Sequence, residues 1–330
     1  MEFQVSLALR RRRGEPVAAA QLASEAGVSD QGLADALDAL GRRGFVVEAH
    51  PLGGVRLLGV PQRLDEKEIG CRLAVSRVGR TVQCVEETAS TNDLAWQAAS
   101  MGPARADGFA VFAEHQSAGR GRRGNRWLAP PHTSVLCSVL VWMPDVPSRG
   151  GQVTRAAALA VAEAIEDQCR LSVGIKWPND LVVDDRKVAG ILVESRPSGG
   201  ASSPVVIGIG INCGQQEEAF PPEIRPHAAS LAMFGEEVDR VLLARAVLTR
   251  LDRVICGIED GADTAEIGRL VAQRCRTIGR RISVREGCGT YTGQVVDLDP
   301  DYGLVVRLAD GGIRSFAALT THVVSLGDNP

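Results

Sequence analysis

The residues best suited to chemistry lie in one short stretch, Glu114 to Pro131, where three arginines are set between three glycines. Its centre reads Gly119-Arg120-Gly121-Arg122-Arg123-Gly124. A guanidinium group is planar and permanently charged, so it suits carboxylate and phosphate oxygens. Glycine lets the backbone approach a ligand closely. The pattern therefore indicates a loop that binds anions.

The same letters match G-x-G-x-x-G, the fingerprint of dinucleotide-binding proteins, which opens a helix that holds a pyrophosphate. Here the continuation is Asn125-Arg126-Trp127-Leu128, then Ala129 and two prolines. Proline removes a helical donor and restricts the residue before it, so no long helix is expected. The remaining alternative to an anion-binding loop is a solvated basic loop without a ligand.

Four further motifs decide between these alternatives. They are the upstream run E-T-A-S-T-N at 87–92 and the downstream runs I-K-W-P-N-D-L at 175–181, D-R-K-V-A-G-I-L-V-E at 185–194 and G-I-G-I-N at 208–212. This ordered set closely resembles the biotin protein ligases. The resemblance covers at least residues 84–214, with looser likeness towards both ends. The family usually has Asp at the position of Ala89.

The resemblance implies an ATP-dependent reaction in two steps. The carboxylate of biotin attacks the α-phosphorus of ATP, which gives biotinyl-5′-AMP and pyrophosphate. A lysine amine of an apo biotin carboxyl carrier protein then attacks the mixed anhydride and releases AMP. Bringing a carboxylate against a triphosphate is repulsive. Preorganised positive charge from arginine and lysine offsets that repulsion, which makes chemical sense of the loop.

The resemblance also assigns roles to individual residues. It implies catalytic roles for Lys187 and Arg122, and biotin contacts for Ser90, Thr91, Asn92, Gln116, Arg120, Gly121, Arg122 and Lys187. It implies nucleotide contacts for Arg123, Trp127, Lys176, Asn179, Asp180 and Asn212. Trp127 would stack on adenine and Asp180 would contact Mg²⁺. Core packing is the alternative for Trp127 and Trp177, and an ion pair with Asp180 is the alternative for Lys176.

Lysine usage supports these assignments. Of 37 basic residues only Lys67, Lys176 and Lys187 are lysines, and two of the three fall inside the motifs. An ammonium group differs from a guanidinium in shape, hydration and the ease with which its pKa moves. Lysine in a chain that otherwise uses arginine therefore indicates a specific requirement.

Composition bounds the remaining possibilities. The 330 residues are 45% apolar with a net charge of −3, which is typical of a globular protein of two or three domains. The eight cysteines form no C-x-x-C pair, which argues against a zinc site and fits a reducing cytosol. The longest apolar run, Val135 to Met143, is too short to span a bilayer. We expect a cytoplasmic protein without membrane contact, and we expect structural or surface roles for its five histidines.

Residues 1–62 predict two helices, a turn at Gly27-Val28-Ser29, a helix capped by Ser29, and a hairpin around residues 51–54. This resembles the winged helix-turn-helix of those ligases that also repress biotin genes. The helix that would read DNA carries Asp30, Gln31, Asp35 and Asp38, and residues 1–60 hold as many acidic as basic residues. Binding to a DNA operator and a role in packing or regulation without DNA both stay open.

We expect residues 61–69 to form a charged linker. Residues 70–275 would form an α+β catalytic domain with a mainly antiparallel or mixed sheet, and the resemblance implies a fold like class II aminoacyl-tRNA synthetases. A capping box is predicted at Ser90-x-x-Asp93. Short strands in residues 276–330 indicate an SH3-like barrel. A lipoate-type acyl ligase and a DNA-binding repressor with a non-catalytic ligase half are the alternative functions, and a homodimer is a further expectation.

Overall fold

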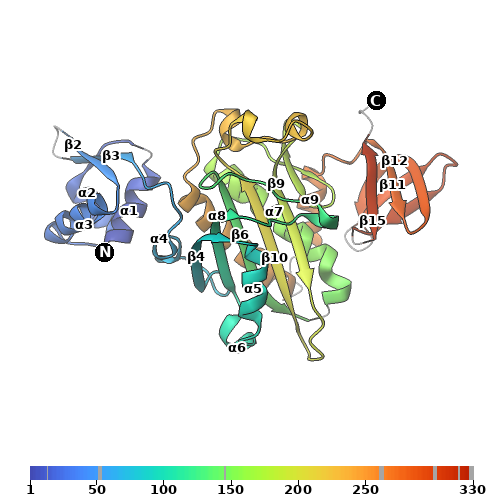
Figure 1. Cartoon of the computed structure of the whole chain (residues 1–330), viewed down its shortest axis with the longest axis horizontal. Helices are drawn as coiled ribbons and strands as arrows, with labels where there is room; N and C mark the ends of the chain where they lie inside the picture. The colour runs from blue at the N-terminus through green and yellow to red at the C-terminus, as the bar shows by residue number, and fades with distance from the viewer. Residues whose placement is uncertain are drawn as a thin grey trace.

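The computed structural model describes the chain except residues 13, 51–53, 145, 260–263, 300–302, 319 and 327–330, and it does not describe the side chains of 146–149 and 325–326. Three groups of elements follow one another along the chain (Figure 1). They are a small helical unit, a large central sheet with helices, and a small unit of strands. No helix among the described residues is long and apolar enough to cross a membrane.

The N-terminal unit contains three helices and a three-stranded sheet of order β1-β3-β2. The helices are α1 (Glu2–Arg11), α2 (Ala19–Ala26) and α3 (Asp30–Arg42), and the strands are β1 (Val17–Ala18), β2 (Val46–His50) and β3 (Gly54–Gly59). Ser29 caps α3 by accepting from the amide of Gly32, as the sequence predicts. The predicted hairpin forms, although residues 51–53 of its turn lie outside the described residues.

The central sheet has seven strands in the order β4-β5-β6-β10-β9-β8-β7. They are β4 (Thr81–Thr88), β5 (Phe109–Gln116), β6 (Ser134–Met143), β7 (Gly174–Lys176), β8 (Asp180–Val183), β9 (Arg186–Ser195) and β10 (Ser203–Asn212). β4 and β5 are parallel and the other pairs are antiparallel, so the α+β class with a mixed sheet is confirmed. The predicted hairpin at Asp184-Asp185 also forms, with both residues at positive φ.

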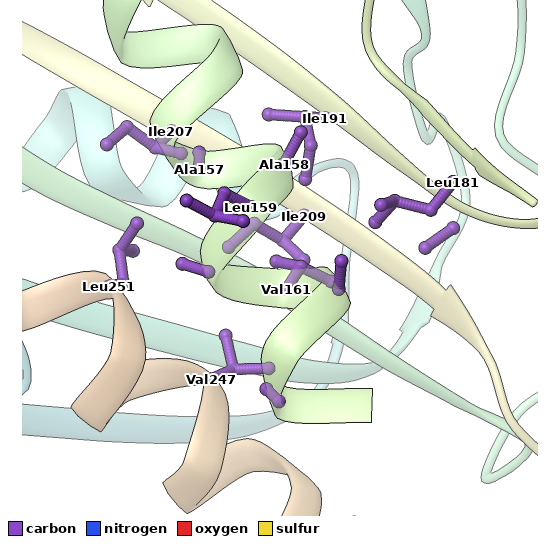
Figure 2. Packing of buried hydrophobic residues seen from close by; sticks show 14 of the residues in the cluster. Ala157, Ala158, Leu159, Val161, Leu181, Ile191, Ile207, Ile209, Val247 and Leu251 are labelled. Carbon is purple, nitrogen blue, oxygen red and sulfur yellow. The ribbon is translucent and has the colours of Figure 1, made fainter. Parts of the chain in front are cut away.

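Helices cover both faces of this sheet because successive side chains of a strand point to opposite faces. Val111 of β5 packs in a cluster with α5 (Thr91–Ala99) and α6 (Pro103–Ala106), whereas its neighbour Phe112 packs in the main core. α7 (Val146–Gln168), α8 (Arg240–Glu259) and α9 (Thr264–Arg274) pack against that main core. Figure 2 shows Leu159 and Val161 of α7 beside Ile209 of the sheet, with Val247 and Leu251 on the neighbouring helix α8.

The charged segment at residues 61–69, which the sequence predicts to be a linker, is packed against the fold. Its last residues belong to α4 (Glu66–Gly70), and Leu64 and Ile69 are buried. The guanidinium of Arg240 donates to the carbonyl of Gln62 at 2.8 Å, and that of Arg245 donates to three backbone carbonyls of residues 68–71. These arginines come from α8, so only the tertiary fold supplies the partners of this segment.

The C-terminal unit is a five-stranded antiparallel sheet of order β14-β13-β12-β11-β15. Its strands are β11 (Arg281–Glu286), β12 (Gly289–Asp299), β13 (Gly303–Leu308), β14 (Ile313–Phe316) and β15 (Thr321–Leu326). Alternating burial, as in Ile282 and Val284 of β11, places one face of this sheet on the main core. The short strands predicted after Gly279 are confirmed.

Candidate active site

A cavity of about 590 Å³ opens between the start of α5, the arginine loop, the end of β7, the strands β9 and β10, and the first residues of β15. The cavity lining includes every site residue named from the sequence except Asn212. These segments lie far apart in the chain, and the sheet order brings them together because β9 and β10 are its inner strands.

The first residues of α5 form a buried wall of the cavity. Ser90, Thr91 and Asn92 are each 3% exposed. The predicted capping box is wrong, because the side chain of Ser90 makes no cap hydrogen bond. The side chain of Gln116 takes the place of a Ser90 cap, because its Oε1 accepts from the backbone amide of Thr91 at 2.7 Å. Asp93, the other half of the predicted box, binds Arg120 instead.

The arginine loop is irregular, as predicted. Arg122–Gly124 form a single 3₁₀ turn in which Arg123 has φ 59°, and no long helix follows. Only glycine fits at position 119, because a Cβ there would lie 2.6 Å from the carbonyl oxygen of Trp127. The Trp127 amide in turn donates to the carbonyl of Gly119 at 3.0 Å. The loop therefore closes on itself and presents its side chains to the cavity.

The three arginines have different partners. Arg120 donates two hydrogen bonds to the carboxylate of Asp93, at 2.7 and 2.9 Å, which raises the pKa of Arg120 and lowers that of Asp93. Arg122 donates to Asn179 Oδ1 at 3.3 Å and to a backbone carbonyl, and Arg123 donates to a second carbonyl. Burial and the nearby Arg123 lower the pKa of Arg122. No described carboxylate forms an ion pair with Arg122 or Arg123, so their charge is available to an anion.

The two carbonyls that hold these arginines belong to Ala318 and Thr321 of the C-terminal unit. Thr321, His322, Val323 and Val324 of β15 also line the cavity, as does His227 from the loop before α8. The sequence reading assigned all histidines to structural or surface roles and missed that two of them face the cavity. No local motif marks these residues, because their position depends on how the last sheet packs against the loop.

Lys187 and Asp180 form an ion pair inside the cavity, with Nζ 2.6 Å from Oδ1. The alternative in which Lys176 takes this carboxylate is therefore wrong for this structure. Lys176 lines the cavity from the end of β7. Asp180 is the one carboxylate among the described lining residues, whereas six of those residues are arginine or lysine. The cavity is therefore strongly basic.

Trp127 forms part of the cavity wall. A Cβ at Gly210 would lie 2.5 Å from its indole ring and one at Gly190 would lie 3.2 Å away. These two glycines face each other across β9 and β10, so they make a flat floor for the ring. Lys187 Nζ lies 5.5 Å from the ring centroid. Trp127 is half-buried and lies outside the hydrophobic core clusters, whereas Trp177 is 4% exposed and belongs to the main core.

Asn212 is the assigned residue that the structure keeps away from the cavity. It is 4% exposed, its Nδ2 donates to the carbonyl of Ala229 and its Oδ1 accepts from Gln215. Both ends of its amide are engaged inside the protein. Asn212 thus holds the segment that follows β10 against the sheet, and its position in a family motif does not by itself make it a ligand contact.

The sequence is similar to those of known ligases. The profile of the Biotin/lipoate A/B protein ligase family matches residues 85–212. The bifunctional ligase/repressor BirA of Bacillus subtilis (strain 168) is 31% identical over 310 residues, covering 89% of this chain and 94% of that protein. The biotin–[acetyl-CoA-carboxylase] ligase of Mycobacterium tuberculosis is 35% identical over 273 residues, covering 80% and 94%.

A solved structure with the same fold is the biotin protein ligase from Aquifex aeolicus in complex with biotin and ATP. It is 24% identical, covers 74% of this chain and 98% of its own, and superposes with a TM-score of 0.61. Together with the identity and coverage of the two relatives above, this leads to one conclusion. The chain belongs to the biotin protein ligase family.

Proposed function

We propose that this chain attaches biotin to a lysine of a biotin carboxyl carrier protein, with ATP as the energy source and biotinyl-5′-AMP as the intermediate. One observation carries the proposal. A single cavity joins a buried polar wall on α5, which suits a small uncharged ring, to a group of cations, which suits a carboxylate beside phosphates. The names of the mycobacterial and Bacillus relatives support the same reaction.

The geometry suggests a division of labour. Biotin would lie with its ring against Thr91 and Gln116 and its carboxylate towards Lys187 and Arg122. There the two cations would offset the repulsion between the attacking carboxylate and the α-phosphate, and they would stabilise the charge that builds up on the phosphate oxygens. Arg120 would act mainly by holding the loop, because two of its guanidinium nitrogens are bound to the carboxylate of Asp93 on α5.

The nucleotide would occupy the other part of the cavity. Trp127, a half-buried residue of the cavity wall, would stack on adenine. Arg123, Lys176 and Asn179 also line the cavity and would meet phosphates or ribose. Mg²⁺ is usually held by one or two carboxylates together with phosphate oxygens. Asp180, the lining carboxylate, fits that pattern, and a bound Mg²⁺ would offset part of the negative charge of the triphosphate.

We further propose that residues 1–62 form a winged helix-turn-helix, residues 70–275 a catalytic domain like class II aminoacyl-tRNA synthetases, and residues 276–330 an SH3-like barrel. The order of helices and strands in each unit supports these assignments. Most buried hydrophobic residues of the N-terminal unit also form a cluster of their own, which includes Leu9, Leu22 and Leu40, whereas Leu7 packs in the main core.

Repression of transcription is a second candidate function, favoured by the name of the Bacillus relative. The surface of α3 argues against tight DNA binding. Its exposed residues include Asp30, Asp35 and Asp38, and Arg42 is the basic residue at its end. DNA binding of this kind depends on cations that contact phosphates. Binding to a DNA operator is therefore proposed separately from the ligase function. A homodimer is proposed separately as well.

The decisive experiment is biotin transfer to a purified apo-carrier domain, together with ATP–pyrophosphate exchange driven by biotin or by lipoate. We expect exchange with biotin only, and a biotinylated carrier lysine. Exchange driven by lipoate and not by biotin would identify a lipoate-type ligase. Absence of exchange with both acids, in a protein that still binds DNA, would identify a repressor with an inactive ligase half.

A further inference from the structure

A chain of hydrogen bonds runs behind the α5 wall of the cavity and ends on a carboxylate. Glu194 of β9 accepts from Asn92 Nδ2 at 2.9 Å and from Trp96 Nε1 at 3.0 Å. Asn92 Oδ1 lies 2.6 Å from Ser138 Oγ, which lies 2.7 Å from Thr91 Oγ1. Thr91 in turn lies against Gln116. The chain thus joins β9, α5, β6 and β5.

The carboxylate gives this chain a direction. An ionised carboxylate can only accept hydrogen bonds, so the NH₂ end of Asn92 must face Glu194 and its oxygen must face Ser138. Ser138 then donates its one hydroxyl hydrogen to Asn92. Thr91 Oγ1 has two acceptors for its own hydrogen, Ser138 Oγ at 2.7 Å and Gln116 Oε1 at 3.1 Å, and in either case that hydrogen is used inside the protein. The backbone amide of Thr91 donates to Gln116 Oε1 at 2.7 Å.

Asn92 is packed closely against β10, at a position where only glycine fits opposite its side chain. Gly208 lies opposite Ser138 across β10 and β6, and a Cβ at Gly208 would come within 2.4 Å of Asn92 Oδ1. Ser138 is fully buried and Asn92 is 3% exposed. A polar group buried in this way is costly unless it is hydrogen-bonded, so a reversal of the amide would be penalised at both of its ends.

The direction of the chain decides what the cavity offers to a ligand. The Thr91 hydroxyl donates its hydrogen inside the protein, so towards the cavity its oxygen can only accept a hydrogen bond. Gln116 Oε1 already accepts a hydrogen bond from the Thr91 amide. Gln116 Nε2 lines the cavity as a donor and has no acceptor among the described residues. An acceptor beside a donor matches a cyclic urea, which carries N–H groups beside a C=O group. A dithiolane ring, as in lipoate, offers neither.

We propose that Glu194 and Ser138 are positioning residues that fix the hydrogen-bond polarity of the biotin-ring site and thereby make it selective for a cyclic urea. This rests on the proposed function and deepens it, because neither residue needs to touch the substrate. A site built to hydrogen-bond its ligand discriminates strongly against an analogue that lacks those groups. The selectivity against lipoate would then originate behind the cavity wall.

The test uses the full-length variants Glu194→Gln and Ser138→Ala. A glutamine can donate as well as accept, so it permits Asn92 to turn, and the alanine interrupts the chain between Asn92 and Thr91. Glu266→Gln on α9, an exposed carboxylate that pairs with Arg269, is the matched control. Dissociation constants for biotin and for lipoate are measured by calorimetry, and KM and kcat by pyrophosphate exchange.

We expect both variants to raise the Kd and KM for biotin by about tenfold or more, with KM for ATP close to that of the parent protein. Glu194→Gln should leave Tm close to the parent value, whereas Ser138→Ala should lower Tm because the buried Asn92 Oδ1 loses its donor. The affinity for lipoate should change little, so the biotin-to-lipoate preference falls. An unchanged biotin affinity, or equal losses for both acids, would overturn the inference. If the parent protein binds biotin but drives no exchange, only the proposed ligase function fails.

Discussion

Lys187 Nζ and Asp180 Oδ1 lie 2.6 Å apart, on the neighbouring strands β9 and β8. The ion pair sets the ammonium group in the middle of the cavity, 5.5 Å from the ring centroid of Trp127. A cation held in this way is preorganised, so little reorganisation is needed when a carboxylate meets a phosphate there. This geometry supports the proposal that Lys187 takes part in catalysis.

We predict that Lys187→Ala lowers the rate of adenylate formation by roughly 10²–10³-fold, which is typical of removing one preorganised group that stabilises transition-state charge. Single-turnover formation of biotinyl-AMP is the measurement. Lys67→Ala is the matched control, because Lys67 is an exposed lysine of α4 outside the cavity lining. A near-normal rate in the Lys187 variant would remove this residue from the catalytic step.

Arg122 reaches from the arginine loop to Asn179 and to the carbonyl of Ala318, so it closes one side of the cavity. We predict that Arg122→Gly still forms the adenylate but releases it, because loss of this closure lets water and ligand exchange. Biotinylation of a bystander protein, assayed beside the true carrier, detects the escaped intermediate. Arg170→Gly, at an exposed arginine outside the lining, should label the carrier alone. Carrier-only labelling by both variants would contradict the prediction.

Arg10 of α1 is 2% exposed and ties the N-terminal unit to the core through Glu68, at 3.0 Å, and Asp239, at 2.7 Å. We predict that Arg10→Ala lowers the free energy of unfolding by about 3 kcal/mol, because the buried Glu68 loses its close cation and keeps only Ser6 and a 4.0 Å contact with Arg43. Urea denaturation is the measurement. Arg12→Ala, which removes an exposed pair with Glu25, should cost about 0–1 kcal/mol. Equal effects would show that burial of the Arg10 pair is irrelevant.

We predict that the N-terminal unit gives no tight, sequence-specific DNA complex at physiological salt, because the exposed face of α3 is acidic. A gel shift with the full-length protein, with and without biotinyl-AMP and at several salt concentrations, is the measurement. The variant Asp35→Lys, Asp38→Lys serves as a positive control for charge, since it should gain weak binding that disappears as salt rises. A nanomolar complex of the unaltered protein would instead establish an operator-binding function.

Burial raises the pKa of Cys213 to about 12 and also raises that of the fully buried Cys137. The thiolate is the reactive form, so a raised pKa means slow alkylation. We predict that iodoacetamide at pH 8 modifies the exposed Cys288 and leaves both buried thiols unmodified until urea is added. Peptide mass spectrometry gives the result directly. Modification of Cys213 in the folded protein would mean that the sheet around it opens.

Much of the site follows from local sequence. Glycine and arginine types at 119–124 predict an irregular basic loop, since glycine tolerates close contact and the prolines after Ala129 stop a helix. Paired strands around Asp184-Asp185 follow from turn chemistry. These predictions succeed because each depends on residues near one another in the chain. The resemblance then names the site residues, and the cavity contains all of them but Asn212.

Tertiary structure alone decides the partners of those residues. Local spacing indicates a capping box at Ser90, yet Gln116 of β5 takes the amide and Arg120 takes Asp93. Asn212 belongs to a site motif, yet both ends of its side-chain amide form hydrogen bonds inside the protein. The residues of β15 reach the cavity only because the last sheet packs on the arginine loop. A charged or polar side chain has several partners of similar energy, and the packing of distant elements selects among them.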